Sequence, residues 1–348
     1  MSIQVPPFEP HPWLRGGHRQ TIVGRYLPGP RVRLDSRSWE IELDDGDRLS
    51  IRDSVPAGWS AGGPSALLLH GLGGSAGAPY VVRVAGKLVK LGIRVIRMNL
   101  RGAGEGFGLA RRFYHSGRTE DVRAVVEWFG QIAPGSPVAL VGYSLGGDLA
   151  LKLAAEAAVR PLPGLDAVLA ANPPIDLAAC CRRIRQRGNW IYDRNFVRQL
   201  RGEVRRLHAR FPDLGPLDLG GTRTLFEFDD RYTAPRNGFE GAEDYYARCS
   251  AGPLIPRIRV PGLVVHALDD PFIPAEAFRR VRFPASLALE LIESGGHLGY
   301  IGRSHGMAAH RWLDARLSVW LAEHWGLNAP DRVGVALVSA SQGADLEG

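Results

Sequence analysis

Cysteine and long apolar runs are scarce in this sequence. The chain has three cysteines among 348 residues, and Cys180, Cys181 and Cys249 form neither a disulfide framework nor the spacing of a metal site. The first residues have neither a basic start nor an apolar run. No stretch approaches the roughly 18 apolar residues of a membrane span. We therefore expect a cytoplasmic protein in a reducing compartment, without a signal peptide, a transmembrane helix or a bound metal.

Lysine is equally scarce, and the positive charge is unevenly spread. Only three of the 43 basic residues are lysine, so 40 are arginine. The formal net charge is +7, and the segment Arg182–Arg210 alone holds ten arginines against two acids. The remainder is close to neutral, which argues against a nucleic-acid-binding protein. The length allows one large core with an inserted subdomain.

A serine between two glycines follows a strand-like segment at 138–141. In Gly142-Tyr143-Ser144-Leu145-Gly146 the glycines lie two residues on either side of the serine, and a helical pattern follows. A strand that turns so sharply into a helix leaves no room for side chains at the glycine positions and exposes the hydroxyl. We interpret Ser144 as a nucleophile. The alternative is an ordinary strand-to-helix turn, which chance supplies in a chain with 43 glycines.

Short apolar segments alternate with helical patterns on both sides of Ser144. This alternation predicts an α/β protein with a mostly parallel sheet of about eight strands flanked by helices. Expected strands are 38–43, 48–52, 65–70, 93–98, 138–141, 166–171, 262–267 and 287–292, with helices at 81–91, 119–131 and 307–325. We divide the chain into an extended N-terminal arm (1–37), a core (38–174 and 257–326), an inserted, mainly helical cap (175–256) and a loose tail (329–348).

Two loops after Ser144 carry the groups that a serine nucleophile needs. The hydroxyl requires an adjacent base, and the base requires an orienting carboxylate. His297 follows the strand 287–292 in a glycine-rich loop and is the expected base. After the strand 262–267 we favour Asp270 as the acid and keep Asp269 as the alternative, with a plain helix-capping turn as the non-catalytic interpretation. His266 and His305 are weaker candidates for the base, because we expect His266 in a strand and His305 on the last helix.

The loop after 65–70 is the candidate oxyanion hole. His70-Gly71-Leu72-Gly73-Gly74 turns backbone N–H groups towards a substrate carbonyl, so we expect the N–H groups of Leu72 and Leu145 to be the donors. His70 then shapes the loop and is not the base. No phosphate-binding glycine pattern is present, and we interpret Arg101, in the loop after 93–98, as structural.

These elements together resemble the α/β-hydrolases across roughly residues 38–325. Three further sequence motifs are more specific and resemble the YheT-type bacterial branch, which is related to the eukaryotic ABHD1, ABHD2 and ABHD3 group. They are Trp13-Leu14 with Gln20-Thr21, His70 to Ser75, and Tyr114 to Gly117 with Glu120-Asp121. The resemblance implies hydrolysis of an ester or lipid without a cofactor and fixes no substrate. The segment Asn172-Pro173-Pro174 departs from the family pattern.

The residues thus predict a serine ester hydrolase that cleaves a short-chain or lipid-like acyl ester through an acyl-enzyme. An acyltransferase that uses the same intermediate is one alternative, and a non-catalytic protein that binds lipids or other small molecules is another. The sequence leaves the oligomeric state open.

The arginine-rich cap carries its own alternatives. Five apolar residues fall on one face of a predicted helix, and arginines crowd the remaining faces. That pattern is either a solvated basic surface or a site for peripheral contact with anionic lipid through Arg182–Arg210, at the inner membrane face. The apolar residues are Phe196, Leu200, Val204, Leu207 and Phe211.

Overall fold

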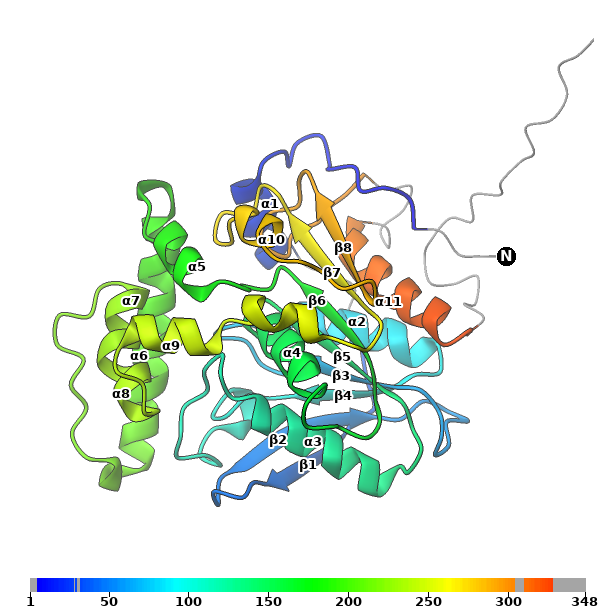
Figure 1. Ribbon diagram of the computed structural model, residues 1–348, viewed down its shortest axis with the longest axis horizontal. Helices are drawn as coiled ribbons and strands as arrows, with labels where there is room; N and C mark the ends of the chain where they lie inside the picture. Colours follow the sequence, from blue (N-terminus) through cyan, green and yellow to red (C-terminus); the bar gives the residue numbers. More distant parts are fainter. Residues whose placement is uncertain (1–4, 28, 30–31, 304–309, 328–348) are drawn as a thin grey trace, which may run out of the picture.

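The computed structural model describes residues 5–27, 29, 32–303 and 310–327, and its core is an eight-stranded sheet (Figure 1). The strand order is β1-β2-β4-β3-β5-β6-β7-β8. β2 pairs antiparallel with β1 and with β4, and the other neighbours are parallel. The predicted mostly parallel sheet is confirmed. The strands are β1 (Arg37–Glu42), β2 (Arg48–Ser54), β3 (Ser65–Leu69), β4 (Arg94–Met98), β5 (Val138–Tyr143), β6 (Leu165–Ala171), β7 (Gly262–Ala267) and β8 (Leu287–Ile292).

Helices cover both faces of this sheet. All residues of β3, β4, β5 and β7 are buried, which explains the nearly continuous apolar sequences of β3, β5 and β7. α3 (Thr119–Ile132) and α4 (Leu145–Glu156) pack on one face, and α2 (Pro79–Lys90) and α11 (Trp312–His324) on the other.

The last helix begins later than predicted. Arg311 forms an isolated bridge with Ile301, so α11 starts at Trp312. The earlier part of the predicted helix, with His305, lies outside the described residues, as does the predicted tail at 329–348.

The inserted segment is helical and lies beside the core, at the left of Figure 1. Its longest helix, α6 (Trp190–Arg210), buries Leu200, Val204 and Leu207, which belong to the predicted apolar face. The other helices are α5 (Leu177–Ile184), α7 (Leu225–Phe228), α8 (Ala234–Arg236) and α9 (Ala242–Cys249), and α10 (Glu276–Arg279) follows β7.

The N-terminal arm contains a helix, so the expectation of an extended arm was wrong for residues 17–26. α1 (Gly17–Tyr26) packs so closely on the core that a Cβ at Gly17 would collide with the carbonyl oxygen of Asp269. A Cβ at Gly24 would lie 2.6 Å from the Cα of Gly299. Glycines weaken the local helix signal, and here tertiary packing decides the conformation.

Candidate active site

Ser144 lies in a strained turn between β5 and α4. Its backbone has φ 51° and ψ −124°, a conformation that side chains other than glycine rarely adopt. A Cβ at Gly142 would collide with the carbonyl oxygen of Gly146, and one at Gly146 would lie 2.5 Å from the carbonyl oxygen of Leu69. Both glycines are therefore required by packing, and the turn presents the serine hydroxyl at the carboxyl end of β5.

His297 links Ser144 to Asp270. Its Nε2 lies 3.0 Å from Ser144 Oγ, and its Nδ1 lies 2.8 Å from Asp270 Oδ2. The other carboxylate oxygen of Asp270 accepts hydrogen bonds from the N–H groups of Phe272 and Ile273, at 2.8 and 3.1 Å. Burial opposes ionisation of Asp270, but His297 and the backbone donors hold its pKa below the ordinary value. A charged carboxylate therefore faces the imidazole.

Asp269 points to the loop instead of to the imidazole ring. One of its oxygens accepts from the Gly296 N–H at 2.8 Å, and the other accepts from the Ser294 hydroxyl at 3.1 Å. These bonds brace the loop that carries His297. The geometry thus places Asp270, and not Asp269, next to the candidate base.

Asn172 belongs to the site, although the sequence marked it only as a departure from the family pattern. Its Nδ2 donates to Asp270 Oδ2 at 2.6 Å and to the Gly296 carbonyl at 3.1 Å, and its Oδ1 accepts from the Tyr300 hydroxyl at 2.9 Å. It directly follows β6, at the sheet edge where such sites form. That position was the one signal for its role.

The loop after β3 lies against the serine. A Cβ at Gly71 would be 3.0 Å from the Cβ of Ser144. The N–H groups of Leu72 and Leu145 have no hydrogen-bond acceptor within the described residues, so both are free to bind an oxygen at this point.

His70 ties this loop to its neighbour. Its Nδ1 donates to the Gly71 carbonyl at 2.8 Å, because its Nε2 accepts from the Leu100 N–H at 3.1 Å. Burial lowers the pKa of His70 to about 4, so the ring is neutral. It shapes the loop, as the sequence predicted.

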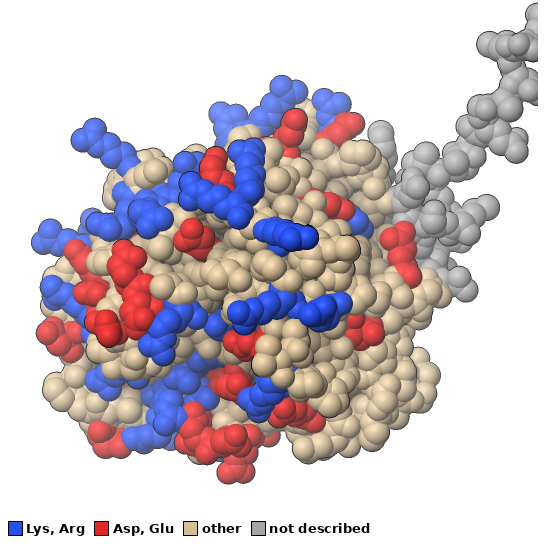
Figure 2. All heavy atoms as spheres, viewed as in Figure 1, with Lys and Arg blue, Asp and Glu red and all other residues tan. Residues whose placement is uncertain are grey.

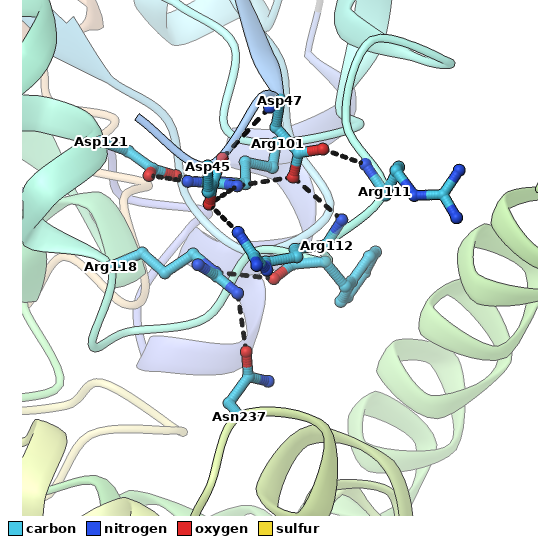
Figure 3. Close-up of polar contacts among 9 residues, drawn as sticks. Asp45, Asp47, Arg101, Arg111, Arg112, Arg118, Asp121 and Asn237 are labelled. Carbon is cyan, nitrogen blue, oxygen red and sulfur yellow. Dashed lines mark hydrogen bonds and ion pairs between the residues drawn. The ribbon is translucent and has the colours of Figure 1, made fainter. Parts of the chain in front are cut away.

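The guanidinium of Arg101 is surrounded by acids (Figure 3), and Arg101 is not among the residues that line the pocket at Ser144. It donates to Asp121 through two bonds of 2.6 and 2.7 Å, to Asp47 at 2.6 Å and to Asp45 at 2.7 Å. Burial works against its charge, but the acids raise its pKa above the ordinary value. The structural interpretation of Arg101 agrees with these contacts, and His266 is fully buried in β7 as expected.

An apolar pocket extends from Ser144 between the core and the cap. It encloses about 810 Å³ of space, part of it continuous with solvent. Its wall includes Leu72 and Phe272 from the core and Leu177, Phe196, Leu200 and Phe228 from the cap.

The described part of the chain offers no cluster of His, Cys, Asp and Glu that could hold a metal ion. Within the same residues, no helix combines the length and the apolar character needed to cross a membrane.

Known proteins are similar to this chain in sequence. A family model described as alpha/beta hydrolase fold matches residues 64–304. The chain is 33% identical to YheT of Escherichia coli (strain K12), whose name proposes that it is an esterase, over 88% of this chain and 90% of YheT. It is 27% identical to the Mus musculus phospholipase ABHD3, over 84% of this chain and 73% of that protein.

Solved structures agree on the fold. The α/β hydrolase GrgF from Penicillium sp. sh18 matches with a TM-score of 0.57 at 19% identity, over 84% of this chain and all of that one. The Pyrococcus furiosus esterase Pf2001 matches with a TM-score of 0.55 at 17% identity, over 86% and 96% of the two chains. The chain therefore belongs to the α/β-hydrolase family, in the branch that contains YheT and is related to the ABHD group.

Proposed function

We propose that this esterase-type α/β-hydrolase cleaves carboxylic esters of apolar acyl groups through an acyl-enzyme at Ser144. The observation that carries the proposal is the continuous hydrogen-bonded series of Ser144, His297 and Asp270. Its relatives include proteins named as a phospholipase and a monoacylglycerol lipase, and both names denote ester hydrolysis.

The first half of the reaction forms the acyl-enzyme. Ser144 Oγ attacks the ester carbonyl carbon while His297 Nε2 takes the hydroxyl proton. The Asp270 carboxylate holds the ring and stabilises its positive charge. The N–H groups of Leu72 and Leu145 donate to the carbonyl oxygen as it becomes negative. The C–O bond to the alcohol then breaks, and His297 returns the proton to the leaving oxygen.

Water completes the reaction. His297 takes a proton from a water molecule, whose oxygen attacks the acyl carbon. The bond between that carbon and Ser144 Oγ then breaks, the acid leaves, and His297 returns the proton to Ser144 Oγ. An alcohol in place of water would give an acyltransferase. The partial continuity of the pocket with solvent favours water, and its apolar wall favours the acyl chain as the group bound.

The test is Ser144→Ala. We expect this variant to lose p-nitrophenyl ester turnover by at least about 10³-fold, because the nucleophile is absent, and to resist labelling by a fluorophosphonate probe. Ser60→Ala, at an exposed position, is the matched control and should behave as wild type. Circular dichroism should show that both variants are folded. Turnover of folded Ser144→Ala at the wild-type rate would refute the proposal.

The cap supports a second proposal, peripheral contact with an anionic membrane surface. Within the described residues, no arginine of Arg182–Arg210 forms an ion pair with a carboxylate, whereas Arg83, Arg94 and Arg101 of the core all do. Figure 2 shows basic side chains gathered over the upper part of the cap and over α1. Two exposed apolar residues that begin α6, Trp190 and Ile191, lie among these arginines, and this combination is typical of membrane-surface segments.

A further inference from the structure

The loop that carries His297 has an unusual backbone. Leu298 and Tyr300 have positive φ values of 60° and 41°, and Gly295 and Gly296 also have positive φ. Side chains other than glycine persist in such conformations only where the surroundings over-determine them. This loop therefore needs support from outside its own sequence.

Helix α1 of the arm supplies that support at the histidine itself. Thr21 Oγ1 accepts a hydrogen bond from the His297 backbone N–H at 2.8 Å. The Thr21 hydroxyl in turn donates to the Gly17 carbonyl at 2.7 Å. Because its proton is used within α1, the hydroxyl oxygen is held with a lone pair towards His297.

Gln20 binds the same segment of chain four residues further on, at Ile301. Its buried side-chain amide accepts from the Ile301 N–H at 2.8 Å and donates to the Ile301 carbonyl at 3.0 Å and the Leu14 carbonyl at 2.8 Å. The oxygen and both N–H groups of the amide are thus used. A Cβ at Gly299 would collide with the Gln20 carbonyl oxygen, so the backbones of α1 and the loop are in close contact.

We propose that Gln20 and Thr21 are positioning residues for the base, which hold the loop so that His297 Nε2 stays within reach of Ser144. The inference rests on the proposed function, in which His297 is the base. Without the Thr21 oxygen, the His297 N–H loses its acceptor, and the strained loop relaxes. Small displacements of a catalytic group are costly because reaction requires close alignment.

Thr21→Val tests this directly, because valine keeps the shape of threonine and removes the hydroxyl. We expect kcat for p-nitrophenyl butyrate to fall about 10- to 100-fold while KM stays within about twofold, since α1 contributes no residue to the pocket wall. Thr21→Ser keeps the acceptor and should restore kcat to within about twofold of wild type. Ile22→Ala, on the exposed face of α1, should leave both constants unchanged.

A second measurement separates positioning from general stability. In a His297→Ala background the base is gone, so Thr21→Val should cause no further loss of the residual turnover. An additional loss in that background, or a wild-type kcat for Thr21→Val alone, would overturn the inference. Thr21→Ala replaces Thr21→Val in the same comparison if the valine prevents folding. An active Ser144→Ala variant would instead overturn the proposed function.

Discussion

Two adjacent aspartates at the end of β7 have different surroundings, and this difference is decided residue by residue. Asp270 is 1% exposed and contacts the imidazole, two backbone N–H groups and Asn172. The side-chain oxygens of Asp269 accept hydrogen bonds from the glycine-rich loop instead, from Ser294 and Gly296. Proximity to the imidazole ring, and not position in the sequence, thus separates the candidate orienting acid, Asp270, from Asp269, which braces the loop.

Replacement of each aspartate by asparagine should reveal this division. We expect Asp270→Asn to lower kcat by about 10³- to 10⁴-fold, because a neutral amide neither fixes the required tautomer of His297 nor stabilises its charge. Asp269→Asn keeps an oxygen for the Gly296 N–H and should cost about tenfold or less. Steady-state kinetics with a soluble ester, alongside circular dichroism, gives both values. Equal losses of kcat in the two variants, or a larger loss for Asp269→Asn, would show that Asp270 is not the orienting acid.

The triad candidates were predictable because each follows its own strand, and parallel strands bring such loops to one edge of a sheet. Asn172 and Gln20 were not predictable in the same way. Asn172 hydrogen-bonds to Gly296, 124 residues away, and Gln20 hydrogen-bonds to Ile301, 281 residues away. No local pattern encodes such pairings, because they exist only once the sheet has formed.

Among the elements, strands were easier to predict than the arm helix for a physical reason. β3, β5 and β7 are buried on both faces and need continuous apolar sequence, whereas α1 contains glycines that its close packing demands. The same glycines hide the helix from propensity arguments. The element that was hardest to predict is the one that contacts the His297 loop.

The cap helix α6 makes a comparable contact with the loop after β3. Gln199 Nε2 donates to the Gly73 carbonyl at 2.7 Å, and the Gly73 N–H donates to the Tyr114 hydroxyl at 2.9 Å. Glu203 accepts from both partners, at 3.0 Å from Gln199 and 3.1 Å from Tyr114. Both polar backbone groups of Gly73 are therefore tied to α6, one residue beyond the N–H of Leu72.

We expect Gln199→Leu to lower kcat about tenfold with little change in KM. Loss of an entire oxyanion donor costs roughly 10²- to 10³-fold, and a donor that is only loosened should cost less. Tyr114→Phe loosens the other side of Gly73, so the double variant should lose less than the product of the single losses.

Asn195→Leu, one turn earlier on α6 and exposed, is the matched control for Gln199→Leu and should keep wild-type kinetics. Multiplicative losses in the double variant would show that the two residues act independently. A wild-type kcat for Gln199→Leu would show that α6 does not affect this loop.

For the whole molecule, the distribution of ion pairs decides which surface carries unpaired positive charge, and the net charge alone does not. Core arginines are matched by buried acids, as Arg83 is by Asp314 and Arg94 by Asp53. The ten arginines of Arg182–Arg210 have no such partners among the described residues, and all of them except the half-buried Arg201 are exposed. Their charge is therefore directed outwards, on a helix that also lines the pocket through Phe196.

This arrangement predicts binding to anionic vesicles and little binding to neutral ones. A sedimentation assay would compare phosphatidylcholine vesicles with and without about 30% phosphatidylglycerol, and binding should weaken with salt because these charges are exposed. The combined change of Arg187, Arg194 and Arg198 to Gln should weaken binding roughly 100-fold, at about 1 kcal/mol for each arginine near an anionic surface. Turnover of a soluble ester should not change, since none of the three lines the pocket.

The matched control removes the same net charge elsewhere, by changing Arg48, Arg160 and Arg279 to Gln. These exposed arginines each pair with a glutamate outside the cap, and we expect their loss to weaken vesicle binding by less than about threefold. Equal weakening by the two triple variants would mean that net charge alone attracts the protein to the membrane. Equal binding of wild type to neutral vesicles would rule out the basic surface of the cap as the cause.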